Sequence, residues 1–220
     1  MSPTTRGPYA KTAATKQRIL EACIDAFAEG GFHGATMKDI ARRAGISYTG
    51  LLHHFPKKDE LLLAVLDLRA ERDHEFLGEI DSLDPLANPG GVLRGMLEIT
   101  RRNQKRPGLI ELHAVMSGEA ASADHPAHQH YIENYNNLRT YYKAMYSALA
   151  RDGLLSTSAE PRMLADLTIS VINGIQGRWL FDHSVDMEKA MRTFLAGIVP
   201  QLESLVSQAE TSDPPVSARS

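Results

Sequence analysis

A stretch between residues 36 and 55 carries polar side chains in a spacing that suits contacts to DNA. It reads TMKDIARRAGISYTGLLHHF, and its second half offers hydroxyls, imidazoles and a glycine. Hydroxyls and imidazoles can bond phosphates or base edges, and glycine lets the backbone approach a partner closely. The candidate contact residues, here and just after it, are Thr36, Lys38, Ser47, Tyr48, Thr49, Gly50, His53, His54 and Lys58. An ordinary helical hairpin with a polar solvent face has the same spacing, so that alternative stays open.

The first half of this stretch has the apolar spacing of a short helix. Thr36 with Asp39 forms a capping-box pattern at its start, and Gly45 suits the left-handed position that ends a helix. Its apolar residues recur at i, i+3, i+4 and i+7 and therefore share one face: Met37, Ile40, Ala41 and Ala44. The polar residues then face outward: Lys38, Asp39, Arg42 and Arg43.

The second half predicts another short helix, held at a steep angle to the first. Ser47 can cap it, and Leu51, Leu52 and Phe55 give it a buried edge. The connection is about three residues long, the length found in a helix-turn-helix. Because the major groove of B-DNA admits one α-helix, we expect this second helix to enter it.

Several motifs in order give the segment from about Thr15 to Leu66 a family resemblance. An alanine-rich helix is followed by GGFHGAT, then DIARRAGIS, then LLHHFPKKDELLLAVL. This segment resembles the DNA-binding domain of the TetR family of transcriptional regulators. The resemblance implies a homodimeric, all-helical repressor whose larger C-terminal domain binds a small molecule, a step that moves the DNA-reading helices apart. It also implies that Lys58 contacts phosphate.

One residue departs from the family pattern. The family usually has a phosphate-contacting Tyr where this chain has Leu52. Either His53, His54 or Tyr48 then supplies that contact, or it is absent. If it is absent, a helical adaptor or sensor that has lost DNA binding becomes the alternative function.

Periodicity and turn signals predict an all-α fold of about nine helices. Besides the two short ones, we expect helices over about 12–29, 57–80, 92–105, 109–118, 127–151, 161–181 and 186–208, the last one bent at Pro200. The expected organisation is a flexible arm over 1–11, a helix-turn-helix domain over 12–60, an effector-binding and dimerisation domain over 61–208, and a disordered tail over 209–220.

Charge and composition agree with a regulator of this kind. The chain has 220 residues and a formal net charge of −3. Residues 1–60 hold nine Lys/Arg and six Asp/Glu, so positive charge collects where DNA would lie. The single cysteine, Cys23, excludes an intrachain disulfide and lies on the apolar face of the first long helix. With no secretory signal and no uncharged run long enough to span a bilayer, we expect a cytoplasmic protein.

The last two predicted helices have more apolar surface than one protomer needs. In the helix over 161–181, apolar residues cover two opposite sides, so one side is free for a partner. Together with the closing helix it would form a four-helix dimer interface, as the resemblance also implies. The predicted interface residues are Ile172, Gly174, Trp179, Phe194, Leu195, Ile198 and Leu202.

A small-molecule site is predicted among the middle helices of the C-terminal region, on the strength of the resemblance. Aromatic and Met side chains can form apolar walls, and a few polar groups can orient a ligand. The candidates are Phe76, Met96, His113, Met116, Tyr131, Tyr135, Tyr142, Met145, Asn173, Gln176 and Trp179. Each one singly suits core packing as well. As a set they suggest an apolar or aromatic effector.

Metal and enzyme chemistry find little support. His125, His128 and His130 lie within six residues, but their spacing fits no helical face and Pro126 interrupts it, so we interpret them as a solvated loop cap and expect no metal or other cofactor. No nucleophile–base motif, phosphate-binding Gly-rich loop or H-E-x-x-H signature is present. The sequence therefore predicts a DNA-binding regulator rather than an enzyme. We expect it to bind a pseudo-palindromic operator as a homodimer.

Overall fold

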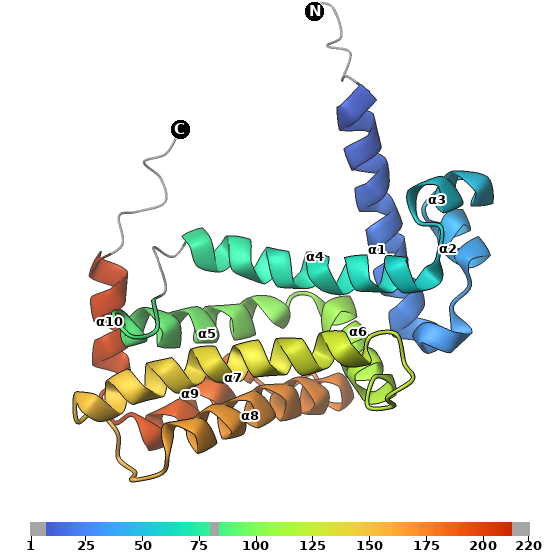
Figure 1. Cartoon of the computed structure of the whole chain (residues 1–220). Coiled ribbons are helices and arrows are strands. Elements are labelled where there is room, and N and C mark those ends of the chain that lie inside the picture. The colour runs from blue at the N-terminus through green and yellow to red at the C-terminus, as the bar shows by residue number, and fades with distance from the viewer. Residues whose placement is uncertain (1–7, 80–83, 213–220) are drawn as a thin grey trace, which may run out of the picture. The chain divides into compact units, whose positions relative to one another are not determined.

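The computed structural model describes the backbone of residues 8–79 and 84–212, and the side chains of 12–68 and 84–209. Throughout these ranges the elements are helices, ten in all, as Figure 1 shows. They are α1 (Pro8–Gly34), α2 (Met37–Arg43), α3 (Tyr48–His54), α4 (Lys58–Glu79), α5 (Pro89–Asn103), α6 (Pro107–Glu119), α7 (His128–Arg151), α8 (Pro161–Phe181), α9 (Met187–Ile198) and α10 (Leu202–Ser212). The all-α prediction is confirmed.

Contacts divide the chain into two compact units. The first comprises residues 1–69 and 111–130, and the second comprises 70–110 and 131–220. The helix-turn-helix segment therefore shares its unit with most of α6 and the turn after it, whereas the sequence placed its domain boundary at residue 60. Within the described residues, no helix is both long and apolar enough to cross a membrane.

The first unit buries one apolar face of each of its helices. In α1, Ile19, Cys23 and Phe27 are fully buried, at the spacing of a single helical face. Burial raises the pKa of the Cys23 thiol, because a thiolate would lose its hydration there. The first turns of α4 add their own buried side chains: Leu61, Leu62, Val65 and Leu66.

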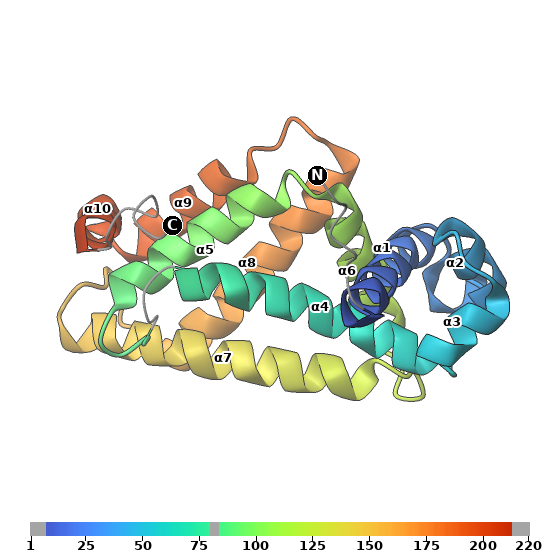
Figure 2. The ribbon, with the colours of Figure 1, turned by 90° about the horizontal axis from the view of Figure 1, so that it is seen from above.

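The core of the second unit is contributed by α5, α7, α8, α9 and α10, helices that Figure 2 shows from above. Its fully buried members include Leu93 of α5, Met145 and Tyr146 of α7, and Leu195 of α9. The Tyr146 hydroxyl shares a hydrogen bond of 2.7 Å with Thr168 Oγ1 of α8, so these two buried hydroxyl groups are paired.

The closing helix is broken where the sequence predicted a bend. Helix α9 ends at Ile198, and α10 begins at Leu202 after a turn in which the Leu202 N–H donates to Val199 O at 3.0 Å. Pro200 has no N–H and its ring crowds the preceding turn, so the helix stops rather than bends. Helix α10 then packs against α5, and residues 209–212, expected in the disordered tail, are its last turn. Residues 213–220 lie outside the described range.

Candidate nucleic-acid interface

Both short helices begin with the side-chain caps that the sequence predicted. Thr36 Oγ1 accepts from the Asp39 N–H at 3.2 Å, and Ser47 Oγ accepts from the Gly50 N–H at 3.0 Å. Gly45 has a φ of 65°, and the Ile46 N–H beside it donates to Ala41 O at 3.0 Å. The turn between α2 and α3 is therefore fixed by local hydrogen bonds, and each capping hydroxyl keeps its own hydrogen to donate outward.

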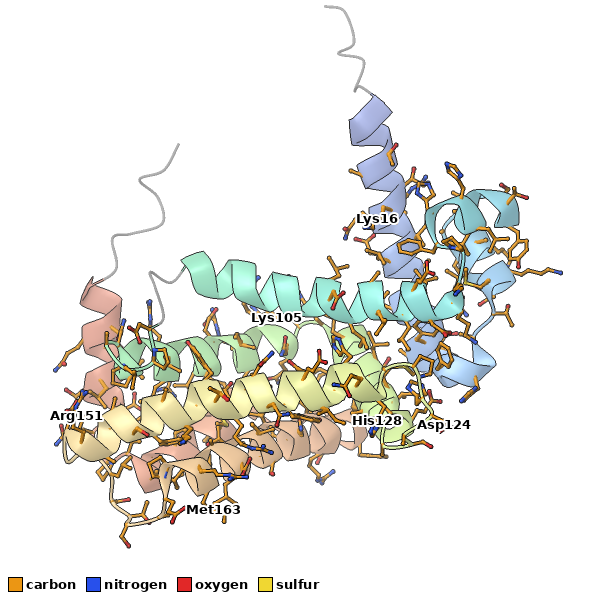
Figure 3. The ribbon with its side chains drawn as sticks, viewed as in Figure 1. Lys16, Lys105, Asp124, His128, Arg151 and Met163 are labelled. Atoms are coloured by element: carbon orange, nitrogen blue, oxygen red, sulfur yellow. The ribbon has the colours of Figure 1, made fainter. Side chains whose placement is uncertain are left out.

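The recognition helix α3 is anchored along one edge. Leu51 is fully buried and Phe55, at the C-cap, is 6% exposed. The Nζ of Lys16, labelled in Figure 3, lies 5.8 Å from the centroid of the Phe55 ring. Leu52 is half-buried, and its side chain has no polar atom, so it makes no phosphate hydrogen bond. One edge of α3 is thus fixed, and the opposite edge faces solvent.

The solvent edge of α3 carries the polar residues that the sequence singled out. Tyr48, Thr49 and His53 are exposed, and His54 is half-buried with its ring 6.1 Å from that of His53. Lys38 of α2 joins them, because its Nζ lies 6.0 Å from the centroid of the Tyr48 ring. We call the set Lys38, Tyr48, Thr49 and His53 the α2–α3 surface.

Gly50 is placed where a larger residue would disturb the helix cap. A Cβ at this position would lie 3.1 Å from Ser47 Oγ, closer than ordinary contact. Any side chain there would therefore press on the hydroxyl that caps α3. The presence of glycine at position 50 therefore has a structural reason, in addition to the close approach to DNA that the sequence predicted.

The two arginines that face outward on α2 are already paired with acids. Arg43 Nη2 lies 2.6 Å from Glu29 Oε2 and its Nε lies 2.6 Å from Asp39 Oδ2, while Arg42 also contacts Asp39. Hydrogen bonds from Arg42 and then Arg43 lower the pKa of the Asp39 carboxyl. These pairs join α2 to α1 and leave Lys38 as the cation of the α2–α3 surface.

Lys58 serves the fold in a way that the sequence did not predict. Its Nζ donates to Ala35 O at 2.7 Å and lies 4.5 Å from the centroid of the Phe32 ring. Partial burial lowers the pKa of the ammonium. Lys58 therefore ties the start of α4 to the α1–α2 connection, whereas its neighbour Lys57 is exposed.

The predicted effector residues are spread over both units. His113 and Met116 belong to the first unit, and the side chain of Phe76 lies outside the described residues. Met96 and Met145 fill the core of the second unit, with Tyr142 packed against it, and Tyr131 is buried. Gln176 and Trp179, one turn apart on α8, are each at least 94% buried, and neither Gln176 Oε1 nor Trp179 Nε1 has a hydrogen-bond partner among the described residues.

Two further candidates, Tyr135 and Asn173, meet at an open groove between α7 and α8. Asn173 Nδ2 donates to Tyr135 Oη at 3.2 Å. The groove has a volume of about 270 Å³ and is also lined by Arg139, Asp166, Ile169 and Ser170. An ion pair of 2.6 Å joins Arg139 Nε to Asp166 Oδ1 across it. The groove thus combines an ion pair and an amide with the apolar surface of Tyr135 and Ile169.

The predicted dimer residues need correction. Leu195 and Leu202 are at most 1% exposed and Trp179 is 6% exposed, so all three are core residues of their own protomer. Ile172, Phe194 and Ile198 are half-buried against the same core. Gly174 alone of the seven is exposed. The large apolar side chains that face solvent on α8 are Met163 (labelled in Figure 3), Leu167 and Phe181, which with Gly174 recur at intervals of four and seven residues. We call these four residues the α8 stripe.

The histidine cluster holds no metal site and is less solvated than predicted. His125 is 6% exposed, and its Nδ1 accepts from the Ala127 N–H at 3.2 Å. The Nδ1 of His128 lies 2.8 Å from Ala120 O. Among the described residues, no group of three or more His, Cys, Asp or Glu is arranged to hold a metal ion. Histidine side chains therefore accept or share hydrogen bonds with the backbone of this turn, as expected of a loop cap, but the His125 imidazole is buried.

Comparisons with known proteins identify the α1–α4 segment. Residues 19–65 match the family described as "Bacterial regulatory proteins, tetR family". HTH-type transcriptional regulator RutR of Escherichia coli is 48% identical over 54 residues, which are 24% of this chain and 26% of RutR. The chain thus spans about a quarter of that relative. HTH-type transcriptional regulator AcrR of Shigella flexneri is 25% identical over 190 residues, covering 83% of this chain and 86% of AcrR.

The likeness of the fold extends beyond this segment. The structure of SmeT with triclosan superposes with a TM-score of 0.70 at 19% identity, covering 84% of this chain and 92% of that one. The relatives named here are transcriptional regulators and not enzymes. The α1–α4 segment is therefore a DNA-binding domain of the tetR family of bacterial regulatory proteins, and the rest of the chain shares its fold with SmeT.

Proposed function

We propose that the protein is a DNA-binding transcriptional regulator that reads a two-fold symmetric operator as a homodimer. The observation that carries this proposal is the α2–α3 surface, a solvent-facing edge of hydroxyl, imidazole and ammonium groups on a helix whose other edge is buried. A regulator of this kind acts in the cytoplasm, where the chromosome lies. The test is selection of duplexes from a random library, followed by mobility shifts at several salt concentrations. No enriched duplex would reject the proposal.

Contacts divide by chemistry. Lys38, Lys57 and the capping hydroxyls of Thr36 and Ser47 suit phosphates, because an ammonium and an O–H group donate to phosphate oxygens without reading sequence. Thr49 and His53, on the exposed edge of α3, suit base edges. Tyr48, which is exposed at the first position of α3, also suits base edges.

The roles of the neighbouring lysines can be separated with matched substitutions. We expect Lys58→Met to lower the free energy of unfolding by about 1–2 kcal/mol, since Ala35 O loses its donor, and to leave the salt dependence of DNA binding unchanged. Lys57→Met should leave unfolding unchanged and flatten the slope of log affinity against log salt by about one unit. Urea unfolding and binding titrations measure both quantities. If Lys58→Met flattened the salt slope and Lys57→Met did not, Lys58 would be the residue that contacts phosphate.

Dimerisation is proposed through the α8 stripe. Met163, Leu167 and Phe181 are 55%, 45% and 89% exposed, values high for large apolar side chains that share one helical face. Gly174, within the stripe, adds no side chain, so a second helix can approach the backbone there. Two copies related by a two-fold axis would cover each stripe with its own equivalent, as closed symmetric dimers require.

We propose that a small apolar or aromatic effector releases the DNA by binding in the second unit. SmeT, whose structure contains triclosan, is a relative in fold. Gln176 Oε1 and Trp179 Nε1 provide an acceptor and a donor, both buried and both without a hydrogen-bond partner in the part of the chain that the structure describes. A ligand with one hydroxyl on an aromatic body could satisfy either of them.

Trp179 provides a direct readout for this effector, because it is the one tryptophan of the chain. We expect a ligand in the second unit to change the emission of Trp179 and to weaken DNA binding over the same concentration range, as linkage requires. Triclosan is the first probe, followed by other chlorinated phenols. A compound that changes Trp179 emission but leaves DNA affinity unchanged would contradict the proposed coupling.

A further inference from the structure

Phe32, in the last turn of α1 just after the kink at Gly31, is held by a carboxylate from a distant part of the chain. The Phe32 N–H donates to Glu119 Oε2, at the end of α6, over 2.7 Å. The two residues are 87 positions apart in sequence but lie in the same unit. The Phe32 ring is 7% exposed. A partly buried backbone amide, directly after the kink of α1, therefore has its partner in a charged side chain.

Gly31 makes room for this carboxylate. Its φ of 66° and ψ of −177° turn the backbone out of the helix. A Cβ at this position would lie 2.1 Å from Glu119 Oε1, so no side chain fits while Glu119 keeps its place. The left-handed backbone and the lack of a side chain both require glycine here.

His125 lies beside Glu119, in the turn after α6 that the labels Asp124 and His128 mark in Figure 3. Because His125 Nδ1 accepts from the Ala127 N–H, the neutral ring carries its hydrogen on Nε2. That nitrogen lies 3.6 Å from Glu119 Oε2, the oxygen that accepts from Phe32. The His125 ring also meets the Phe32 ring edge-on, with centroids 5.1 Å apart.

Lys58, at the start of α4, also contacts the Phe32 ring. Its Nζ lies 4.5 Å from the centroid of the Phe32 ring and bonds Ala35 O, one residue before the Thr36 cap of α2. The connection that leads into α2 is therefore fixed at two points, the Phe32 N–H and the Ala35 carbonyl. Both fixing groups lie outside the helix pair itself.

We infer that Glu119 is a positioning residue for DNA recognition: its bond to the Phe32 amide sets where α2 begins and hence where α3 is presented. This inference rests on the proposed function. Without Glu119 the amide loses its partner, the Gly31–Phe32 turn gains freedom, and part of the binding free energy is spent on ordering the helix pair. Glu119 needs no contact with DNA for this role.

The inference is tested with Glu119→Ala, Glu119→Gln and Glu119→Asp, using a labelled duplex that the wild-type protein enriches from a random library. We expect Glu119→Ala to weaken binding about tenfold and Glu119→Asp, whose carboxylate is one methylene shorter, to weaken it severalfold. Glu119→Gln should stay within about threefold of wild type, since its amide oxygen still accepts from Phe32. Glu111→Ala, an exposed glutamate of the same helix, is the matched control and should change nothing.

Two further readouts separate positioning from general weakening. The slope of log affinity against log salt should be the same in all variants, because no phosphate contact is removed. Hydrogen exchange at the Phe32 amide, followed by NMR in the free protein, should be slow in wild type and Glu119→Gln and fast in Glu119→Ala. Equal DNA affinity of wild type and Glu119→Ala would overturn this inference but leave the proposed function standing. If the wild-type protein enriched no duplex, the proposed function itself would fail, whatever the exchange data show.

Discussion

Replacing Leu167 with Glu is expected to give a folded monomer whose operator affinity is lower by about three orders of magnitude. Leu167 is 45% exposed in the protomer, so the change creates no cavity in the core. In a dimer that pairs two α8 stripes, two carboxylates would be buried near the symmetry axis without partners, at a cost of several kcal/mol. A monomer reads one half-site and loses the gain of linked binding, which is about 10²–10⁴-fold.

Sedimentation velocity and DNA-binding titrations measure the two effects together. Leu86→Glu is the matched control, since Leu86 is 51% exposed, belongs to the same unit and lies outside the α8 stripe. This control should remain dimeric with unchanged operator affinity. A Leu167→Glu protein that sediments as a dimer would show that another surface forms the interface.

Replacing Tyr48 with Ala is expected to weaken operator binding by about 1–3 kcal/mol, or about 10- to 150-fold, and to change which sequences are preferred. Tyr48 is 42% exposed at the start of α3, so removing its ring should change the free energy of unfolding only a little. Tyr48→Phe keeps the ring and removes the hydroxyl, which separates stacking or packing on DNA from hydrogen bonding. Binding of wild type and variants to a panel of single-base operator variants gives both affinity and preference.

Lys38→Ala provides the comparison for Tyr48. Lys38 lies beside Tyr48 on the α2–α3 surface, with Nζ 6.0 Å from the ring centroid, but is assigned to phosphate. Its loss should weaken all duplexes alike and flatten the salt slope by about one unit. If Tyr48→Ala also weakened every duplex equally, the assignment of Tyr48 to sequence reading would be wrong.

The helix pair could be predicted from the sequence because its determinants are local. Thr36 and Ser47 cap the helices that directly follow them, and Gly45 adopts the left-handed conformation that the turn requires. The buried positions Ile40 and Leu51 follow from spacing within a few residues. Caps, turns and helical spacings extend over only a few residues, so they can be recognised without knowing the rest of the fold.

Three of the predicted dimer residues are core residues instead, because a buried helix face and an interface face look alike in a sequence. Leu195 and Leu202 have the periodicity of a free apolar face, but the core of the second unit covers both. Pro200 was expected to bend one helix, and instead it ends α9 so that α10 can pack on α5. Which face a helix buries depends on partners distant in the chain, and the hydrophobic period alone does not name them.

The contacts around Phe32 could not be predicted for a related reason. No pattern links Glu119 to Gly31 and Phe32, since helical and turn spacings extend over only a few residues. Lys58 had a clear motif context, yet its bond to Ala35 O joins segments 23 positions apart. The sequence predicted that the first long helix ends at about residue 29, but it did not predict that Gly31 makes room for the Glu119 carboxylate.

The central claim is that a symmetric dimer presents two copies of the α2–α3 surface to one face of DNA. Hydroxyl-radical footprinting on a duplex enriched from a random library tests it most directly. The account predicts two equivalent protected half-sites related by a two-fold axis, with centres one helical turn of about 34–36 Å, or a multiple of it, apart. A single protected segment without two-fold symmetry would contradict it.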